Sequence, residues 1–173
     1  MIAWLKTQKP VRRVDAPSES KDQGSVVTTL ETGSILLAPV KKGEPIRLVW
    51  KEGDKGQSRP VPPGTWRVAH YAIEKTHQGA LWILSGSGPN GPTVTVTAGR
   101  ESKIEIDPRV HQEFTTLSAG ERLTMALNLK GEHSMGLSIL DASRDGIDRR
   151  VPVTYALLDA NGKELSTGAM TYG

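Results

Sequence analysis

Cysteine is absent from the 173-residue chain. Its absence excludes disulfides, thiolate nucleophiles and cysteine-ligated metal sites. Long apolar runs are missing as well, and the longest runs, such as residues 35–40, have the length of a strand rather than of a membrane span. Aromatic residues are few: four Trp, three Tyr and one Phe. Most of them fall in expected strands where a core needs them, so few are left to form an exposed ligand platform.

The charge is also too small to indicate a nucleic-acid partner. The 22 Lys and Arg against 19 Asp and Glu give a formal charge of +3, whereas phosphate binding needs basic residues gathered on one face. Hydrophobic residues at 36% and charged residues at 24% are typical of a folded chain. The apolar start turns polar after Leu5, too early for a signal-peptide core. With Met1 as the true start we expect a cytoplasmic protein, and an added Met1 leaves an exported location open.

Strand-length runs and turn residues fill the chain from Gly24 onward. Turn signals recur about every eight to twelve residues, which is typical of sandwiches rather than of a parallel sheet. The segment 119–129 is ambiguous, but Leu123, Met125, Leu127 and Leu129 alternate with polar or small residues and favour a strand. The sequence therefore predicts an all-β fold.

We expect two tandem antiparallel β-sandwich modules with an extended basic N-terminal arm: residues 1–24 as the arm, 25–107 as the first module and 108–173 as the second. The seam is placed at Asp107-Pro108. One larger sandwich of about eleven strands is the alternative. Three of the four Trp lie between the arm and the seam, and the first core is predicted to gather them with nearby aliphatic side chains: Trp50, Trp66, Trp82, Ile46, Leu48, Val68, Val94 and Val96.

The motif Pro-Pro-Gly-Thr-Trp-Arg-Val at residues 62–68 resembles the Pro-Gly-x-aromatic-x-Val signature of transthyretin-like, carboxypeptidase-regulatory-like modules. Trp66 stands where tyrosine is usual, and residues 94–99 look like the late strand and turn of that family. The resemblance covers residues 25–106 and implies a β-sandwich that serves as an accessory module without an active site. Residues 108–173 resemble an immunoglobulin-like β module.

Candidate metal ligands are scattered. The four histidines, His70, His77, His111 and His133, lack metal-ligand spacing, and His70 is expected to be partly buried. The best metal candidate is the loop with Asp141, Asp145 and Asp148, whose carboxylates could suit Ca²⁺. Its spacing is not that of an EF-hand and arginines lie beside it, so we expect no metal and no cofactor.

The glycine-rich segment 85–92 is the other candidate for chemistry. It lacks the Lys-Ser or Lys-Thr of a P-loop and the following helix that a nucleophile elbow needs. It is expected to be a mobile hairpin loop. No catalytic residue is predicted anywhere in the chain, and the protein is not expected to be an enzyme.

The N-terminal arm is the candidate docking segment, with Trp4, Lys6, Lys9, Arg12 and Arg13 as its partner-contacting residues. Residues 1 to about 20 are expected to lack regular structure and to make most contacts outside their own domain. The expected partner is a protein or a larger complex, with a membrane surface as the second option. The oligomeric state is left open.

These patterns favour a non-catalytic protein-interaction or scaffold module, an accessory subunit that docks on a larger assembly through its arm and loops. The alternative is a small-ligand or carbohydrate-binding β-sandwich module, for which exposed aromatic side chains would be the sign.

The C-terminal residues 151–172 predict a hairpin. With Asn161-Gly162 as a two-residue type I′ turn, Ala160 pairs with Lys163. The same register places Tyr155 opposite Gly168. One face is then apolar and should meet a core (Val151, Val153, Tyr155, Leu157, Met170 and Tyr172), whereas Thr154, Thr167 and Thr171 lie on the wetter face.

Overall fold

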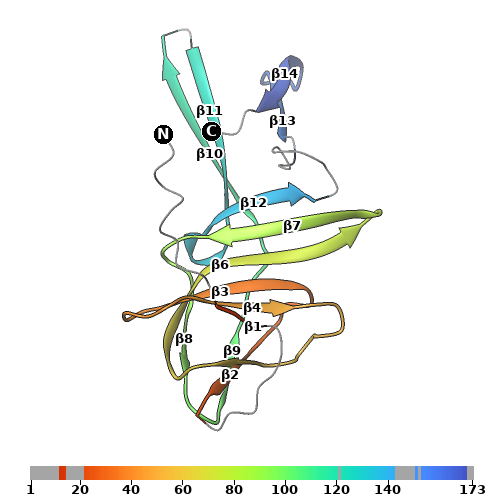
Figure 1. Ribbon diagram of the computed structural model, residues 1–173. Coiled ribbons are helices and arrows are strands. Elements are labelled where there is room, and N and C mark those ends of the chain that lie inside the picture. Colours follow the sequence, from red (N-terminus) through yellow and green to blue (C-terminus); the bar gives the residue numbers. More distant parts are fainter. Residues whose placement is uncertain (1–11, 15–21, 121, 143–150, 152, 171–173) are drawn as a thin grey trace, which may run out of the picture.

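The computed structural model describes residues 12–14, 22–120, 122–142, 151 and 153–170. Within these residues the chain forms fourteen strands and one short 3₁₀ turn, Glu132–Ser134, and no α-helix. The predicted all-β class is therefore confirmed. The strands form three sheets, and the largest carries most of the chain (Figure 1).

Eight strands of the large sheet lie in the order β1 (Arg12–Val14), β4 (Ile46–Trp50), β3 (Gly33–Pro39), β6 (Gly64–His77), β7 (Ala80–Ser87), β12 (Gly136–Asp141), β11 (Arg122–Lys130) and β10 (His111–Ala119). The ninth strand, β8 (Thr93–Val96), pairs with β6. A three-stranded sheet has the order β5 (Arg59–Val61), β2 (Gly24–Thr28) and β9 (Glu101–Ile104). The last two strands, β13 (Val153–Leu158) and β14 (Glu164–Met170), form a hairpin of their own.

The buried core joins the large sheet to the three-stranded one. It takes Ile35 and Val68 from the first and Val26 and Ile104 from the second. Not all neighbours are antiparallel, because β1 pairs with β4 and β2 with β9 in parallel. That corrects the expectation of purely antiparallel modules, and the cause is that β1 and β9 reach their partners by crossing over from distant parts of the chain.

The tryptophan prediction is confirmed for two of its three members. Trp50 and Trp66 are buried in the core, at 1% and 7% exposure, together with Ile46, Leu48, Val68 and Val96, and Val94 packs against them. The prediction for Trp82 is wrong, because its side chain is only half-buried and lies outside the core cluster. It sits in β7 opposite Lys75 and Asp141, away from the middle of β6 that the core follows.

A bulge in β6 changes which residues face the core. Simple alternation places Ala72 on the face of Trp66 and Val68, but the β3–β6 register shifts so that Leu36 pairs with His70 and Leu37 with Val68. Beyond the shift Tyr71 takes the inward position and is buried. The strand register places Tyr71 opposite Gly86, where an added Cβ would overlap the ring. The ring therefore lies across a position that has no side chain.

The large sheet does not break at residue 107. β12 pairs with β7 over six residue pairs, from Gly136↔Ser87 to Asp141↔Trp82. β11 is attached to β12 by the single pair Lys130↔Gly136, so the β10–β11 hairpin projects steeply from the rest of the sheet (Figure 1). Strands from both sides of residue 107 thus share one sheet, and the division into two modules remains a prediction.

The C-terminal hairpin has the predicted register but not the predicted turn. Val153 pairs with Met170, Tyr155 with Gly168 and Leu157 with Ser166, as expected. Gly162 has a positive φ of 80°, but Asn161 does not, and the Asp159 amide donates a backbone bond to Lys163 O that closes a three-residue loop. The Asp159 carboxylate stabilises this loop by accepting bonds from the Asn161 and Lys163 amides.

A bulge restores the register after this loop. The three-residue loop shifts the pairing by one position, and the irregularity between Leu157 and Leu158 shifts it back. Val153, Tyr155, Leu157 and Met170 are half-buried, whereas Thr154 and Thr167 are exposed. The expected apolar face is therefore present, but none of its described residues belongs to the buried cluster, so the core that it was expected to meet is not seen in the described part of the chain. Tyr172 and Thr171 lie outside the described residues.

The expectation of an arm without regular structure is wrong for Arg12–Val14. These residues form β1, the edge strand of the large sheet, in parallel register with Ile46–Leu48 of β4. Val14 is half-buried and packs against the core, which explains the pairing. Trp4, Lys6 and Lys9 lie outside the described residues.

Candidate functional site

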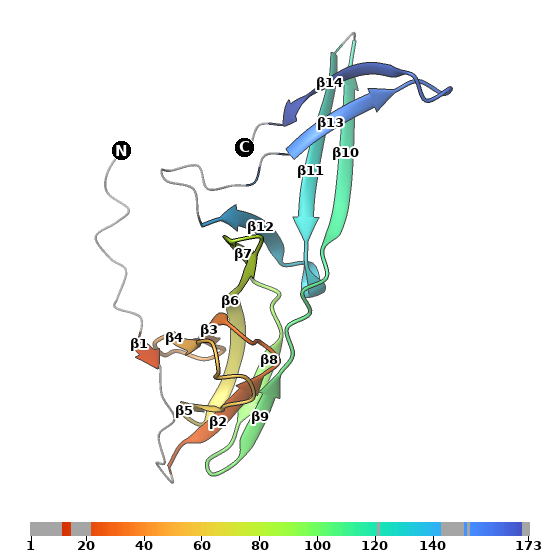
Figure 2. The same cartoon turned by 90° about the vertical axis from the view of Figure 1, so that its right-hand side faces the viewer.

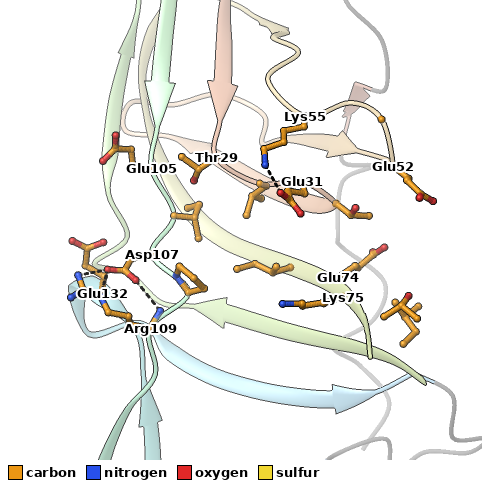
Figure 3. A pocket seen from close by; sticks show the side chains of 18 residues that line it. Thr29, Glu31, Glu52, Lys55, Glu74, Lys75, Glu105, Asp107, Arg109 and Glu132 are labelled. Atoms are coloured by element: carbon orange, nitrogen blue, oxygen red, sulfur yellow. Dashed lines mark hydrogen bonds and ion pairs between the residues drawn. The ribbon is translucent and has the colours of Figure 1, made fainter. Parts of the chain in front are cut away.

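Charged side chains surround an open cleft of about 1160 Å³ (Figure 3). Its floor is apolar and includes Leu30, Ile73 and Ile106. Six carboxylates and three cations line it, namely Glu31, Glu52, Glu74, Glu105, Asp107 and Glu132 with Lys55, Lys75 and Arg109. The lining contains no aromatic ring from the described residues, so it lacks the stacking surface of a carbohydrate site.

Ion pairs already occupy several of these carboxylates. Lys55 bonds to Glu31, and Arg109 bonds to Asp107 through both its backbone amide and its guanidinium. The hydrogen bond from Lys55 lowers the pKa of Glu31, and that from Arg109 lowers the pKa of Asp107. Both carboxylates therefore stay ionised, and neither is suited to act as a general acid near neutral pH.

The candidate metal ligands considered in the sequence do not lie together. His77 ends β6, His111 begins β10 and His133 lies in the 3₁₀ turn, all exposed and on separate elements. No group of three or more His, Asp or Glu arranged to hold a metal occurs among the described residues. Asp141 lies at the end of β12, and the other two residues of the proposed Ca²⁺ loop, Asp145 and Asp148, lie outside the described part.

The glycine-rich segment is only partly a loop. Ser85, Gly86 and Ser87 belong to β7, where they pair with β6 on one side and β12 on the other. That corrects the expected hairpin loop for these three residues, and the cause is their pairing with β6 and β12, which extends the sheet to Ser87. Gly91 packs on the backbone of Val68, whose amide bonds to Pro92 O at 2.9 Å.

His70 is partly buried, as expected, in β6 between β3 and β7. Its Nδ1 atom is buried and makes no hydrogen bond within the described part of the chain. Burial lowers the pKa of His70, and the positive charge of Arg47 lowers it further. A neutral imidazole is therefore favoured. Ser87 is the cross-strand partner of His70 in β7, and no hydrogen bond joins the Ser87 hydroxyl to His70 Nδ1.

The shifted pKa of His70 predicts an acid-sensitive fold. Below the ordinary histidine pKa of about 6.5 the unfolded chain binds a proton that the folded chain resists, so stability falls as the pH drops towards the folded value. His70→Gln should reduce the fall in Tm between about pH 7.5 and 5.5. The exposed His77→Gln is the control and should keep the wild-type fall; equal curves for all three proteins would contradict the prediction.

Several large apolar side chains after residue 107, in the part that we call the second half of the chain, are exposed to solvent. Of the seven large apolar residues that are exposed in the described part, five follow residue 107, including Phe114 at 63% and Leu117 at 68%. Within the described part, Met135 is the single residue of this half in the buried cluster. Because an uncovered apolar surface of this kind is unfavourable in water, it marks a candidate interaction surface.

β10 forms the edge of this surface. All nine of its residues are exposed, and its one described neighbour is β11. Phe114 pairs with Leu127 on one face of the hairpin, whereas Leu117 pairs with Thr124 on the other. The sequence carried this signal, since two large apolar residues three apart in a strand must point to opposite faces.

In Figure 1 the β13–β14 hairpin stands apart from the β10–β11 hairpin, on the side of β11, and in Figure 2 the two hairpins cross in projection. Leu158 and Leu165, near the turn of the β13–β14 hairpin, are 53% and 61% exposed. Both hairpins of the second half therefore carry exposed apolar residues. We call this set the open edge: β10 with Phe114 and Leu117, and the turn end of β13–β14 with Leu158 and Leu165.

Searches against known protein families, curated proteins and solved structures find no match to this chain. The resemblance of residues 25–106 to transthyretin-like modules therefore remains a prediction. Among the described residues, no helix is long and apolar enough to cross a membrane.

Proposed function

We propose that the chain is a non-catalytic protein-interaction module, an accessory or scaffold subunit that docks on a larger assembly. The observation that carries the proposal is the open edge, where Phe114, Leu117, Leu158 and Leu165 stay exposed. Five of the seven exposed large apolar residues of the described part lie after residue 107, and such a concentration indicates an interaction surface. β10, which among the described residues is paired on one side only, adds backbone donors and acceptors to this surface.

The docking surface in this proposal lies on the second half rather than on Arg12 and Arg13. β1 is paired with β4, so these arginines belong to the sheet edge and not to a free arm. Trp4, Lys6 and Lys9 keep a secondary role in the proposal.

The modules of the proposal follow the predicted division. Residues 25–107 act as a transthyretin-like sandwich, which is supported by a core shared between two sheets and by the inward positions of Trp66 and Val68. Residues 108–173 act as an immunoglobulin-like unit that presents the open edge. The first module supplies stability, and the second supplies the contact surface.

Small-ligand binding is the second candidate, and the cleft of about 1160 Å³ is the observation that favours it. Its paired charges and the lack of aromatic side chains among its described lining residues make it a poor carbohydrate site. The open edge therefore carries the proposal.

Capture experiments with two matched variants test the proposed function. Leu165→Ser removes an apolar side chain from the open edge, whereas Val40→Ser removes one that is exposed in the first half. Partner chains recovered from a native extract by the wild type should be retained by Val40→Ser and fall at least about tenfold with Leu165→Ser. Equal recovery by the three proteins, or no recovery by the wild type, would overturn the proposal.

A further inference from the structure

We infer that the open edge binds a second copy of this chain, with β10 pairing antiparallel to β10 of the copy. The inference rests on the proposed function, because it takes the open edge as an interface, and it goes further in naming the occupant. The two hairpins would join into one four-stranded sheet in the order β11, β10, β10 of the copy and β11 of the copy.

The backbone of β10 is suited to this pairing. It is a nine-residue strand, His111–Ala119, without proline, and among the described residues it is hydrogen-bonded on one side only. Edge strands of monomeric proteins are normally protected by lysine, proline, bulges or short length. The register of β10 with β11 runs through all nine residues without a bulge, so the edge of β10 has none of these protections.

The charge pattern of β10 permits a twofold contact. Its single acidic residue, Glu113, is paired with Lys130 at 2.5 Å. The register that uses all nine residues places Thr115 opposite Thr115 of the copy, Phe114 opposite Thr116 and Glu113 opposite Leu117. No like charges then lie opposite each other, and a twofold axis through Thr115 keeps each face of the sheet continuous.

The pairing would also add strands to the apolar face of the hairpin. Phe114, Met125, Leu127 and Leu129 share one face of the hairpin, and a two-stranded hairpin with one apolar face is only marginally stable alone. Phe114, which is exposed in the single chain, would lie beside Thr116 of the copy on this face.

The shape of the chain leaves space for the copy. The β10–β11 hairpin projects from the rest of the sheet, and its tip is far from the core (Figure 2). Antiparallel pairing places the tip of one hairpin beside the base of the other. The two large cores then lie at opposite ends of the joined sheet and do not collide.

Charge exchange at Thr115 tests the inference on the purified full chain. The wild type should have the mass of two chains in light scattering. Thr115→Lys and Thr115→Glu each place like charges opposite each other across the axis, and each should weaken self-association at least about tenfold. An equimolar mixture of the two variants should recover the mass of two chains, because opposite charges would then face each other across the axis. The exposed Thr124→Lys in β11, away from the edge, should leave the wild-type mass unchanged.

The outcomes separate this inference from the proposed function. A wild type with the mass of one chain, or variants that do not recover on mixing, would overturn the β10 dimer. The capture experiment with Leu165→Ser would still report on docking to other chains. A dimer that follows the charge exchange, with no partner captured from the extract, would leave the copy as the occupant and overturn docking on a larger assembly.

Discussion

Asp54→Ala should lower the free energy of unfolding by about 3 kcal/mol, because it leaves a buried guanidinium without its carboxylate. The Arg59 side chain is 1% exposed, and its Nη2 atom lies 2.5 Å from Asp54 Oδ2. Its other bonds go to neutral acceptors such as Val49 O at 2.9 Å. The guanidinium also lies over the Trp50 ring, 5.5 Å from its centroid, so the same charge anchors the core tryptophan.

Urea unfolding measures this loss, and two further variants locate its cause. Glu31→Gln breaks the pair between Lys55 and Glu31, whose side chains are mostly exposed, and should leave the urea midpoint close to that of the wild type. In an Arg59→Met background, Asp54→Ala should cost less than about 1 kcal/mol, because no buried charge remains to be neutralised. Equal losses in the two backgrounds would show that Asp54 acts through its bond to the Lys51 amide instead.

Gly86→Ala should also lower the free energy of unfolding by about 3 kcal/mol, because the added methyl group overpacks the core. An added Cβ at this position would overlap the Tyr71 ring, because the two would be much closer than van der Waals contact allows. The ring cannot retreat easily, because Tyr71 is buried and its hydroxyl lies close to Gly131 in the connection before β12. The same loss should appear in both thermal and urea unfolding.

Gly136→Ala is the matched control for this substitution. Gly136 lies in the neighbouring strand β12, opposite Ser87, and its nearest contact for an added Cβ is 3.7 Å away. Its stability should stay within about 0.5 kcal/mol of the wild type. Introducing Gly86→Ala together with Tyr71→Ala should cost little more than Tyr71→Ala alone. If Gly86→Ala and Gly136→Ala lose the same stability, the contact with Tyr71 is not the reason why position 86 requires glycine.

Local pattern determined the strands and much of the core of this protein. Alternation placed Ile46, Leu48 and Trp50 on one buried face of β4, and the same alternation placed Tyr155 opposite Gly168 in the last hairpin. A one-residue slip would move a whole apolar set to the other face, so side-chain period alone is sufficient to select these positions.

Tertiary structure decided the features that depend on distant partners. The bulge that brings Tyr71 inward arises from the pairing of β6 with β3, and the strand role of Ser85–Ser87 from pairing with β12. The pairing of Arg12–Val14 with β4 and the burial of Arg59 beside Trp50 likewise join segments that the sequence separates. Alternation within one segment carries no information about these neighbours. The open edge has the same origin, because exposure of Phe114 and Leu117 depends on which strands are absent beside β10 in the described part of the chain, and only the assembled sheet shows that.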